Sequence, residues 1–286
     1  MITTRIKQFL YPFYIYPKIS WLRKKKTRQL FSYYQAKAKA GELISYTTTG
    51  LKLFSNMEED GIILWLIALL NIRRGIFLDI GSHDCINSNC ANLVFNFNWE
   101  GTFIDSDKKL LKIGERTYKL FSKTIRQKLR FVANFLTPEN VNEIVGRHAI
   151  NNEIDFMSID IDGNDYFIWK ALTCVRPKIV MIENKVEYGH HEISIPANSY
   201  FLQSEWGASP VSVTKLAEKK GYVLVAANKK GFNTFYLRED LINGTIEPLK
   251  IEDILKDPEV SRDFYDDAVM NAIRDKLEPF RKTNTF

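Results

Sequence analysis

The chain has 286 residues and a formal net charge of +6; 45% of the residues are hydrophobic and 13% aromatic, which favours one sizeable core with terminal extensions over two full domains. The longest apolar run, residues 61–70, is about half of the ~20 residues that cross a bilayer and lies far from the N-terminus, which excludes a membrane span and a signal peptide. Cys85, Cys90 and Cys174 fit neither paired zinc-binding spacing nor a secreted disulfide framework, so we expect a cytoplasmic protein.

The positive charge is concentrated at the N-terminus. Residues 1–41 contain ten Lys and Arg residues and no acid, which leaves 30 basic against 34 acidic residues in the rest of the chain. Aromatic residues from Phe9 to Trp21 interleave with the basic ones, a composition that suits peripheral contact with the inner face of an anionic membrane or with a phosphate-bearing substrate. A helix pair docked on the core with a solvated lysine face explains the pattern equally well. Nucleic acid is not expected as a partner, because no recognition motif is present.

From residue 54 onward, helical and strand patterns alternate. Ser55 and Glu58 have capping-box spacing, which predicts a helix that begins at Ser55 and is apolar nearly all round. Thr137 and Pro138 have the pattern of an N-cap followed by a first helical residue. In chain order, the strands are predicted at 75–80, 101–105, 128–134, 154–160 and 177–184, with helices at 87–97, 108–121, from 137 and from 166 between them.

Near-continuous apolar strands that alternate with helices indicate a parallel sheet covered on both faces. After a loop and a helix, residues 221–226 and 233–238 alternate around a turn and predict a β-hairpin. We therefore predict an α/β fold, a Rossmann-like doubly wound sheet of seven strands that is mostly parallel with an antiparallel terminal hairpin. The predicted segments are a helical N-terminal extension, a cofactor-binding domain and a helical C-terminal extension, at 1–53, 54–240 and 241–286.

The first strand leads into a helix through the turn GSHDCI, residues 81–86. A strand, a glycine turn and a helix N-terminus together form a nucleotide-cofactor site at the carboxyl end of a sheet. A nicotinamide dinucleotide site requires later glycines that are missing here. A cofactor without phosphates, such as S-adenosylmethionine, needs only a close turn and polar groups for its amino acid end. Asp105 ends the second strand, where its carboxylate can accept both ribose hydroxyls.

Cys85 stands in this turn where a second glycine is expected. If its position needs a positive φ, the cysteine costs about 1 kcal/mol, roughly fivefold in affinity, so cofactor binding should survive. A reactive thiol is a rival interpretation, since a helix N-terminus can lower a thiol pKa, but no partner base is evident.

Five ordered blocks between residues 54 and 240 resemble class I S-adenosylmethionine-dependent methyltransferases, specifically the FkbM-like group found in glycan and natural-product pathways. The blocks are FSNMEEDGI, FLDIGSHDCINSNCANL, WEGTFIDSD, SIDIDGNDYFIWKAL and a final block that runs from GASP to YLRED. The fold of that family has seven strands with the last antiparallel, in agreement with the hairpin.

The resemblance also implies a set of cofactor contacts. It places the methionine end of S-adenosylmethionine on the turn after the first strand, the ribose on Asp105, and the adenine beside Asn134 and Phe135. The full set that it implies is Glu59, Asp79, Gly81, Ser82, His83, Asn87, Asp105, Asn134, Phe135 and Asp160.

A carboxylate-rich stretch, SIDIDGND, follows the fourth strand. Asp160, Asp162 and Asp165 stand at the carboxyl end of this strand and therefore border the same crevice as Gly81. A calcium loop counted from Asp160 lacks the required glycine and glutamate. Three interpretations remain: a Mg²⁺ site made of Asp160, Asp162 and Glu183, a general base at Asp160 or Asp162, or a structural role. In the structural role, Asp160 and Asp165 cap the next helix and hold loops.

Histidine is the other candidate base. His190 and His191 follow the fifth strand, in the loop where substrate usually enters, and an imidazole with a pKa near ~6.5 could take the acceptor proton at neutral pH. A loop histidine can equally be a solvated surface residue. Trp206, in the same loop, is expected to shape the acceptor pocket, or only to pack.

Together these patterns predict a methyltransferase that moves a methyl group from S-adenosylmethionine to an oxygen of a small-molecule or glycan acceptor, either a sugar hydroxyl or a phosphate-linked group. Such an enzyme works mostly by positioning. Two alternatives stay open. A catalytically degenerate binding module is favoured only by Cys85, and a nicotinamide-dependent oxidoreductase is disfavoured by the missing glycines and by the hairpin. The sequence identifies neither the acceptor nor the oligomeric state.

Overall fold

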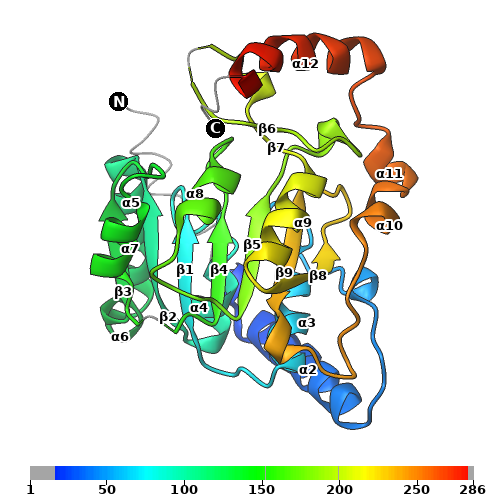
Figure 1. Cartoon of the computed structure of the whole chain (residues 1–286). Helices are drawn as coiled ribbons and strands as arrows, with labels where there is room; N and C mark the ends of the chain where they lie inside the picture. The colour runs from blue at the N-terminus through cyan, green and yellow to red at the C-terminus, as the bar shows by residue number, and fades with distance from the viewer. Residues whose placement is uncertain (1–16, 152, 199, 283–286) are drawn as a thin grey trace.

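The computed structural model describes the chain apart from residues 1–16, 152, 199 and 283–286. At its centre is a sheet of seven strands, which are, in spatial order, β3 (Leu129–Ala133), β2 (Glu100–Asp105), β1 (Ile76–Ile80), β4 (Phe156–Ile159), β5 (Ile179–Glu183), β9 (Asn233–Arg238) and β8 (Tyr222–Ala227) (Figure 1). Strands β1 to β5 are parallel, while β9 is antiparallel to both β5 and β8. The predicted Rossmann-like fold with an antiparallel terminal hairpin is therefore confirmed.

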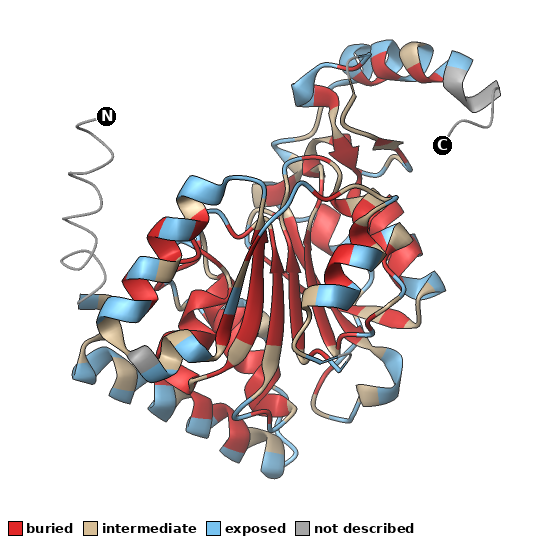
Figure 2. Ribbon diagram, turned by 90° about the vertical axis from the view of Figure 1, so that its left-hand side faces the viewer, coloured by how far each residue is buried: buried red, intermediate tan, exposed pale blue. Residues whose placement is uncertain are grey.

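Helices cover both faces of the sheet. Strand side chains alternate between the two faces, and apolar side chains on each face pack against helices. In β1, Phe77 packs into the core on one face and Leu78 into the core on the other. The first core is covered by α2 (Trp21–Lys39), α3 (Glu59–Leu69), α4 (Ala91–Phe97), α5 (Lys108–Phe121) and α6 (Lys123–Gln127). The second is covered by α7 (Val141–His148), α8 (Asp165–Ala171), α9 (Pro210–Lys219), α10 (Ile251–Leu255) and α11 (Pro258–Ser261). Figure 2 shows the buried residues gathered on the strands and on the inner sides of these helices.

A third, smaller hydrophobic cluster lies above the carboxyl end of the sheet (Figure 1). It joins residues 186–209 to the last helix, α12 (Asp267–Lys282), and we call these two segments the cap. Lys276 of α12 forms an ion pair with Glu205. The cap contains the two-stranded ribbon of β6 (Ser194–Ile195) and β7 (Gly207–Ala208), together with the short 3₁₀ helices η2 (Val186–Tyr188) and η3 (Gln203–Glu205). Two further 3₁₀ helices lie outside it, η1 (Tyr46–Thr48) and η4 (Glu239–Leu241).

Three helices begin later than predicted. One is α4, which was predicted from residue 87 and begins at Ala91. Ser55 does not start a capping box, because its hydroxyl donates to the Asp60 carboxylate at 2.9 Å and the helix α3 begins only at Glu59. Thr137 is not an N-cap either: its N–H donates to the Asn140 side chain at 2.8 Å within a turn, and α7 begins after that turn. No helix within the described residues combines the length and the apolarity needed to span a bilayer.

The Asp60 carboxylate binds the backbone of residues 53–55, the segment that precedes α3. Its Oδ2 atom accepts hydrogen bonds from the backbone N–H groups of Leu53, Phe54 and Ser55 at 2.7, 2.6 and 3.0 Å. Burial raises the pKa of this carboxyl above its ordinary value, although the N–H donors act in the opposite direction. One buried acceptor thus ties residues 53–55 to α3.

We expect Asp60→Ala to lower the free energy of unfolding by about 1–3 kcal/mol, because it leaves buried N–H donors without an acceptor. Urea denaturation followed by circular dichroism measures the change. The control is Glu239→Ala, at an exposed carboxylate, which should change stability by less than about 0.5 kcal/mol. Equal values for the two variants would show that the Asp60 network does not hold the segment.

Candidate functional site

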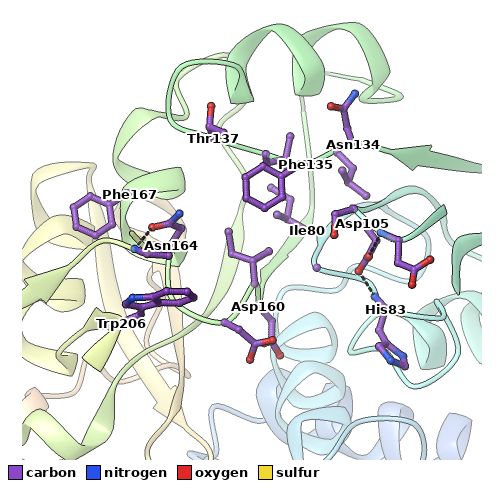
Figure 3. Close-up of a pocket in the computed structure, with 18 of the residues that line it drawn as sticks. Ile80, His83, Asp105, Asn134, Phe135, Thr137, Asp160, Asn164, Phe167 and Trp206 are labelled. Atoms are coloured by element: carbon purple, nitrogen blue, oxygen red, sulfur yellow. Dashed lines mark hydrogen bonds between the residues drawn. The ribbon is translucent and has the colours of Figure 1, made fainter. Parts of the chain in front are cut away.

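An open cleft of about 1400 Å³ lies at the carboxyl end of the parallel strands. One end is formed by the loops after β1, β2 and β3, and the other by the loop after β4, by α8 and by the cap (Figure 3). We call these the turn end and the cap end, and Asp160 lies between them. The turn end is lined by Gly81, His83, Asn87, Asp105, Asn134 and Phe135, and the cap end by Asp162, Asn164, Phe167, Ala197 and Trp206.

Gly81 makes the turn after β1 possible. It has a φ of 85°, and its N–H donates to the carbonyl oxygen of Ile104 on the neighbouring strand at 2.9 Å. A Cβ atom at this position would overlap the carbonyl oxygen of Asp160 at the end of β4. Glycine is therefore required both for the backbone conformation and for the close approach of β1 to β4.

Asp105 holds the turn from the side of β2. Its Oδ2 accepts the His83 N–H at 2.7 Å and its Oδ1 accepts the Asp107 N–H at 2.7 Å (Figure 3). Each carboxylate oxygen has a second lone pair, so this side chain can still accept two hydroxyl groups from a ligand in the cleft. The geometry is compatible with the predicted contact to a ribose.

Cys85 has the positive φ that its place in the turn implied, at 61°. The Tyr118 hydroxyl donates to its carbonyl at 2.8 Å, and its Sγ lies 3.7 Å from the Ser82 hydroxyl. Burial raises the pKa of this thiol well above its ordinary value. The turn therefore forms with cysteine in place of glycine, and the buried, protonated thiol argues against the reactive-thiol interpretation.

Three residues of the predicted cofactor set lie outside the cleft lining. Glu59 is buried, and its Oε1 accepts from the side-chain amides of Asn228 at 2.9 Å and Asn233 at 3.1 Å, so it ties α3 to the β8–β9 hairpin. Asp79 is also buried and accepts the Ser88 hydroxyl at 2.5 Å. The Ser82 hydroxyl donates to a backbone carbonyl at 3.3 Å. The contacts of these side chains lie within the fold and not at the cleft.

The predicted carboxylate set does come together. Asp160, Asp162 and Glu183 each offer one carboxylate oxygen within 4.8 Å of the other two. Burial first and neighbouring carboxylates second raise the pKa of Asp160 to about 8 and of Glu183 to about 10. An oxygen-only set of this kind fits a hard divalent cation, and without one Asp160 and Glu183 hold protons at neutral pH.

Asp165, the other carboxylate of this stretch, shapes its loop. It accepts the N–H groups of Ile161 at 2.8 Å and Gly163 at 2.9 Å, which both precede α8. Asp165 therefore holds the loop, as the structural interpretation expected, but it does not cap the helix, whose N-cap is Asn164. Asp162 sits between these residues with a φ of 56°, a conformation that costs energy for a residue with a Cβ atom. The loop therefore holds Asp162 at the cleft against a local backbone preference.

His190 and His191 lie outside the cleft lining and face the C-terminal extension. The His190 ring packs edge-on against Phe264, with ring centroids 5.7 Å apart. The Nδ1 atom of His191 lies 2.7 Å from a guanidinium nitrogen of Arg274 on α12. Burial, and then the charge of Arg274, lower the pKa of His191. These contacts bind the cap together.

Sequence reasoning passed over Asn164 and Phe167, which line the cap end. The Asn164 Oδ1 atom accepts the Ala197 N–H at 2.8 Å, which connects the start of α8 to the cap (Figure 3). The only available signal was their place directly after the carboxylate stretch. Trp206 does line the cleft, as expected, and its indole N–H donates to the carbonyl of Phe201 at 3.2 Å.

The residues that carry a formal charge among the described lining of the cleft are all acidic. Among the described residues that line it, none is Lys or Arg, whereas five carry carboxylates: Asp105, Asp107, Glu139, Asp160 and Asp162. A cleft of this charge attracts cationic ligands and repels anionic ones.

No family model matches the sequence, and no curated protein matches it. Among solved structures, the chain is similar to the magnesium protoporphyrin IX methyltransferase of Synechocystis PCC 6803 with bound SAH (9% identity, TM-score 0.43, 63% of this chain and 81% of that one). It is also similar to a SAM-dependent methyltransferase of Aquifex aeolicus (14%, 0.36, 57% and 80%) and to a candidate sarcosine dimethylglycine methyltransferase of Galdieria sulphuraria (13%, 0.41, 59% and 61%). Similarity at this level does not assign the chain to a family.

We expect Asp105→Ala to weaken binding of S-adenosylhomocysteine by about 1–3 kcal/mol, because the variant loses both the acceptor for a ligand hydroxyl and the anchor of the turn. Isothermal titration calorimetry measures the affinity. Asp105→Asn keeps one side-chain oxygen and should lose less. If Asp105→Ala binds as tightly as the wild type, Asp105 does not belong to a cofactor site.

A pH dependence follows from the raised pKa of Asp160. The folded carboxyl keeps its proton up to about pH 8, while the unfolded one loses it near its ordinary value of 3.8. The free energy of unfolding should therefore fall as the pH rises between these values. Asp160→Asn should reduce the fall in melting temperature between about pH 5 and about pH 8, measured in EDTA.

The control is Asp240→Asn at an exposed site, where the pKa is lowered and the carboxyl is ionised throughout this range. Its melting temperature should follow the wild-type slope. Parallel slopes for the wild type and both variants would contradict the assignment of a protonated Asp160.

Proposed function

We propose that the chain is an S-adenosylmethionine-dependent methyltransferase that methylates an uncharged hydroxyl group of a small-molecule or glycan acceptor. The observation that carries the proposal is the single cleft that joins the Gly81 turn and Asp105 to the aromatic and amide side chains under the cap. Cofactor and acceptor would share this cleft, with Asp160 where they meet. Because Cys85 adopts the required backbone conformation, it does not favour the degenerate binding module.

The charge of the cleft supports the choice of an uncharged acceptor. A positively charged sulfonium fits a cleft lined by carboxylates, whereas a phosphate-linked acceptor would have no cationic partner among the described lining residues. Trp206 and Phe167 offer apolar surface and Asn164 a side-chain amide at the cap end. Such a set suits a hydroxylated acceptor with an apolar face, of which a sugar ring is one example.

When bound, S-adenosylmethionine would supply a methyl group on a positively charged sulfur. The turn end would hold the nucleoside, and the cap end would direct an acceptor hydroxyl toward the methyl group, so that the carbon–oxygen bond forms as the carbon–sulfur bond breaks. The hydroxyl proton must leave. Asp160, with its pKa raised to about 8, or the more exposed Asp162 would take that proton when ionised.

The carboxylate cluster has a second possible role in the same reaction. Asp160, Asp162 and Glu183 would hold Mg²⁺, which would lower the pKa of an acceptor hydroxyl and orient it. The two roles predict different effects of a chelator: it should stop turnover if the carboxylates hold a metal and leave turnover unchanged if they act as a direct base.

The proposal is tested in two stages. S-adenosylhomocysteine should raise the melting temperature of the protein, and NAD should not. Release of S-adenosylhomocysteine is then measured over a panel of acceptors in which each neutral hydroxyl compound is paired with its phosphorylated form. Turnover should be found with neutral members and should fall strongly in Asp160→Asn and Asp162→Asn.

EDTA separates the two roles of the carboxylates, because loss of turnover that Mg²⁺ restores supports the metal site and full turnover supports a direct base. A melting temperature that NAD raises and S-adenosylhomocysteine does not would contradict the proposal. Turnover restricted to the phosphorylated acceptors would contradict the choice of an uncharged acceptor.

A further inference from the structure

The helix α2 belongs to the folded body. One side of it packs on the first core through Phe31 and Tyr34, which are both buried. Gln35 donates to the Asn71 side chain at 2.5 Å, and Arg28 donates to the backbone carbonyl of Asn96 at 3.4 Å. The docked-helix alternative therefore holds for this part of the N-terminal extension, while the predictions made for residues 1–16 lie outside the described residues.

The opposite side of α2 faces solvent and has an unusual composition. Trp21 is 70% exposed, Leu22 62% and Tyr33 51%. Lys25 and Lys26 are exposed between them, and the Lys25 ammonium lies 5.1 Å from the centre of the Trp21 ring. The helix contains no acidic residue at all. We call this surface, made of Trp21, Leu22, Lys25, Lys26, Tyr33 and Lys39, the α2 face.

We propose that the α2 face is a docking surface for a membrane that contains anionic lipids. Lysine side chains beside such a surface gain electrostatic energy, and tryptophan and tyrosine rings favour the headgroup layer, where one part of the ring is apolar and another polar. The phosphates of a nucleic acid would bind the lysine side chains, but a nucleic acid would offer Leu22 no apolar environment. The headgroup layer of an anionic membrane can bind the lysine side chains and also take up the apolar side chains of the α2 face.

The position of the face has a consequence for orientation. Asn71 and Asn96, which anchor α2, precede β1 and β2, so α2 lies across the amino end of these strands (Figure 1). The cleft opens at their carboxyl end. A protein docked through α2 would therefore present its cleft away from the membrane, to molecules in solution or to groups that extend beyond the headgroups.

Co-sedimentation of the full chain with vesicles tests the proposal. The vesicles are phosphatidylcholine alone and phosphatidylcholine with about 30% phosphatidylserine, at increasing salt. The wild type should bind the anionic vesicles, lose binding as salt rises, and ignore the neutral ones. Lys25→Glu with Lys26→Glu should lower the partition coefficient by about tenfold or more, and Trp21→Ala with Tyr33→Ala should also lower it.

The matched control is Lys170→Glu with Lys219→Glu, which makes the same change in net charge at exposed positions on α8 and α9, on the other side of the sheet. It should bind as the wild type does. All variants alter exposed side chains, so their melting temperatures should match that of the wild type. Equal vesicle binding by the α2 variants and the control would overturn the proposal. So would salt-sensitive binding of a single-stranded oligonucleotide, through the same lysines, without binding of the vesicles.

Discussion

The close approach of the Gly81 turn to the end of β4 is the constraint on which the rest of the site depends. Only a residue without a Cβ atom lets the turn approach the Asp160 carbonyl this closely. The close approach places the loops after β1 and β4 side by side at the base of the cleft. Asp105 closes the other side through its bonds to the His83 and Asp107 N–H groups. The turn end of the cleft and the Asp160 carboxylate thereby become neighbours, although Gly81 and Asp160 are far apart in the sequence.

The cap end of the cleft is built from elements outside the sheet. Trp206 and Ala197 belong to the cap, whose hydrophobic cluster is separate from the two cores that flank the sheet. Within the cap, the C-terminal helix α12 is joined to residues 186–209 by that cluster and by the ion pair of Lys276 with Glu205. The sheet and its turns thus provide the turn end of the cleft, and the cap contributes to its other end. In the proposed function, the turn end would take the cofactor and the cap end would distinguish acceptors.

The sequence predicted the strands well, because Phe77 and Leu78 are adjacent and both apolar, and near-continuous apolar strands are typical of a sheet with two covered faces. It predicted helix starts poorly: α3 begins only at Glu59, and the Ser55 hydroxyl donates to the Asp60 carboxylate and accepts the Asp60 N–H. It could not show that Glu59 binds the asparagines of a hairpin some 170 residues away, or that His191 faces Arg274. Those contacts depend on how distant segments meet, which local patterns do not record.

The most direct test of the account is a crystal structure of the protein with S-adenosylhomocysteine. We predict that the ribose hydroxyls bind Asp105, that the adenine lies beside Asn134 and Phe135, and that the sulfur faces Asp160 and the cap end of the cleft. A ligand bound elsewhere, or a ribose directed away from Asp105, would contradict the account.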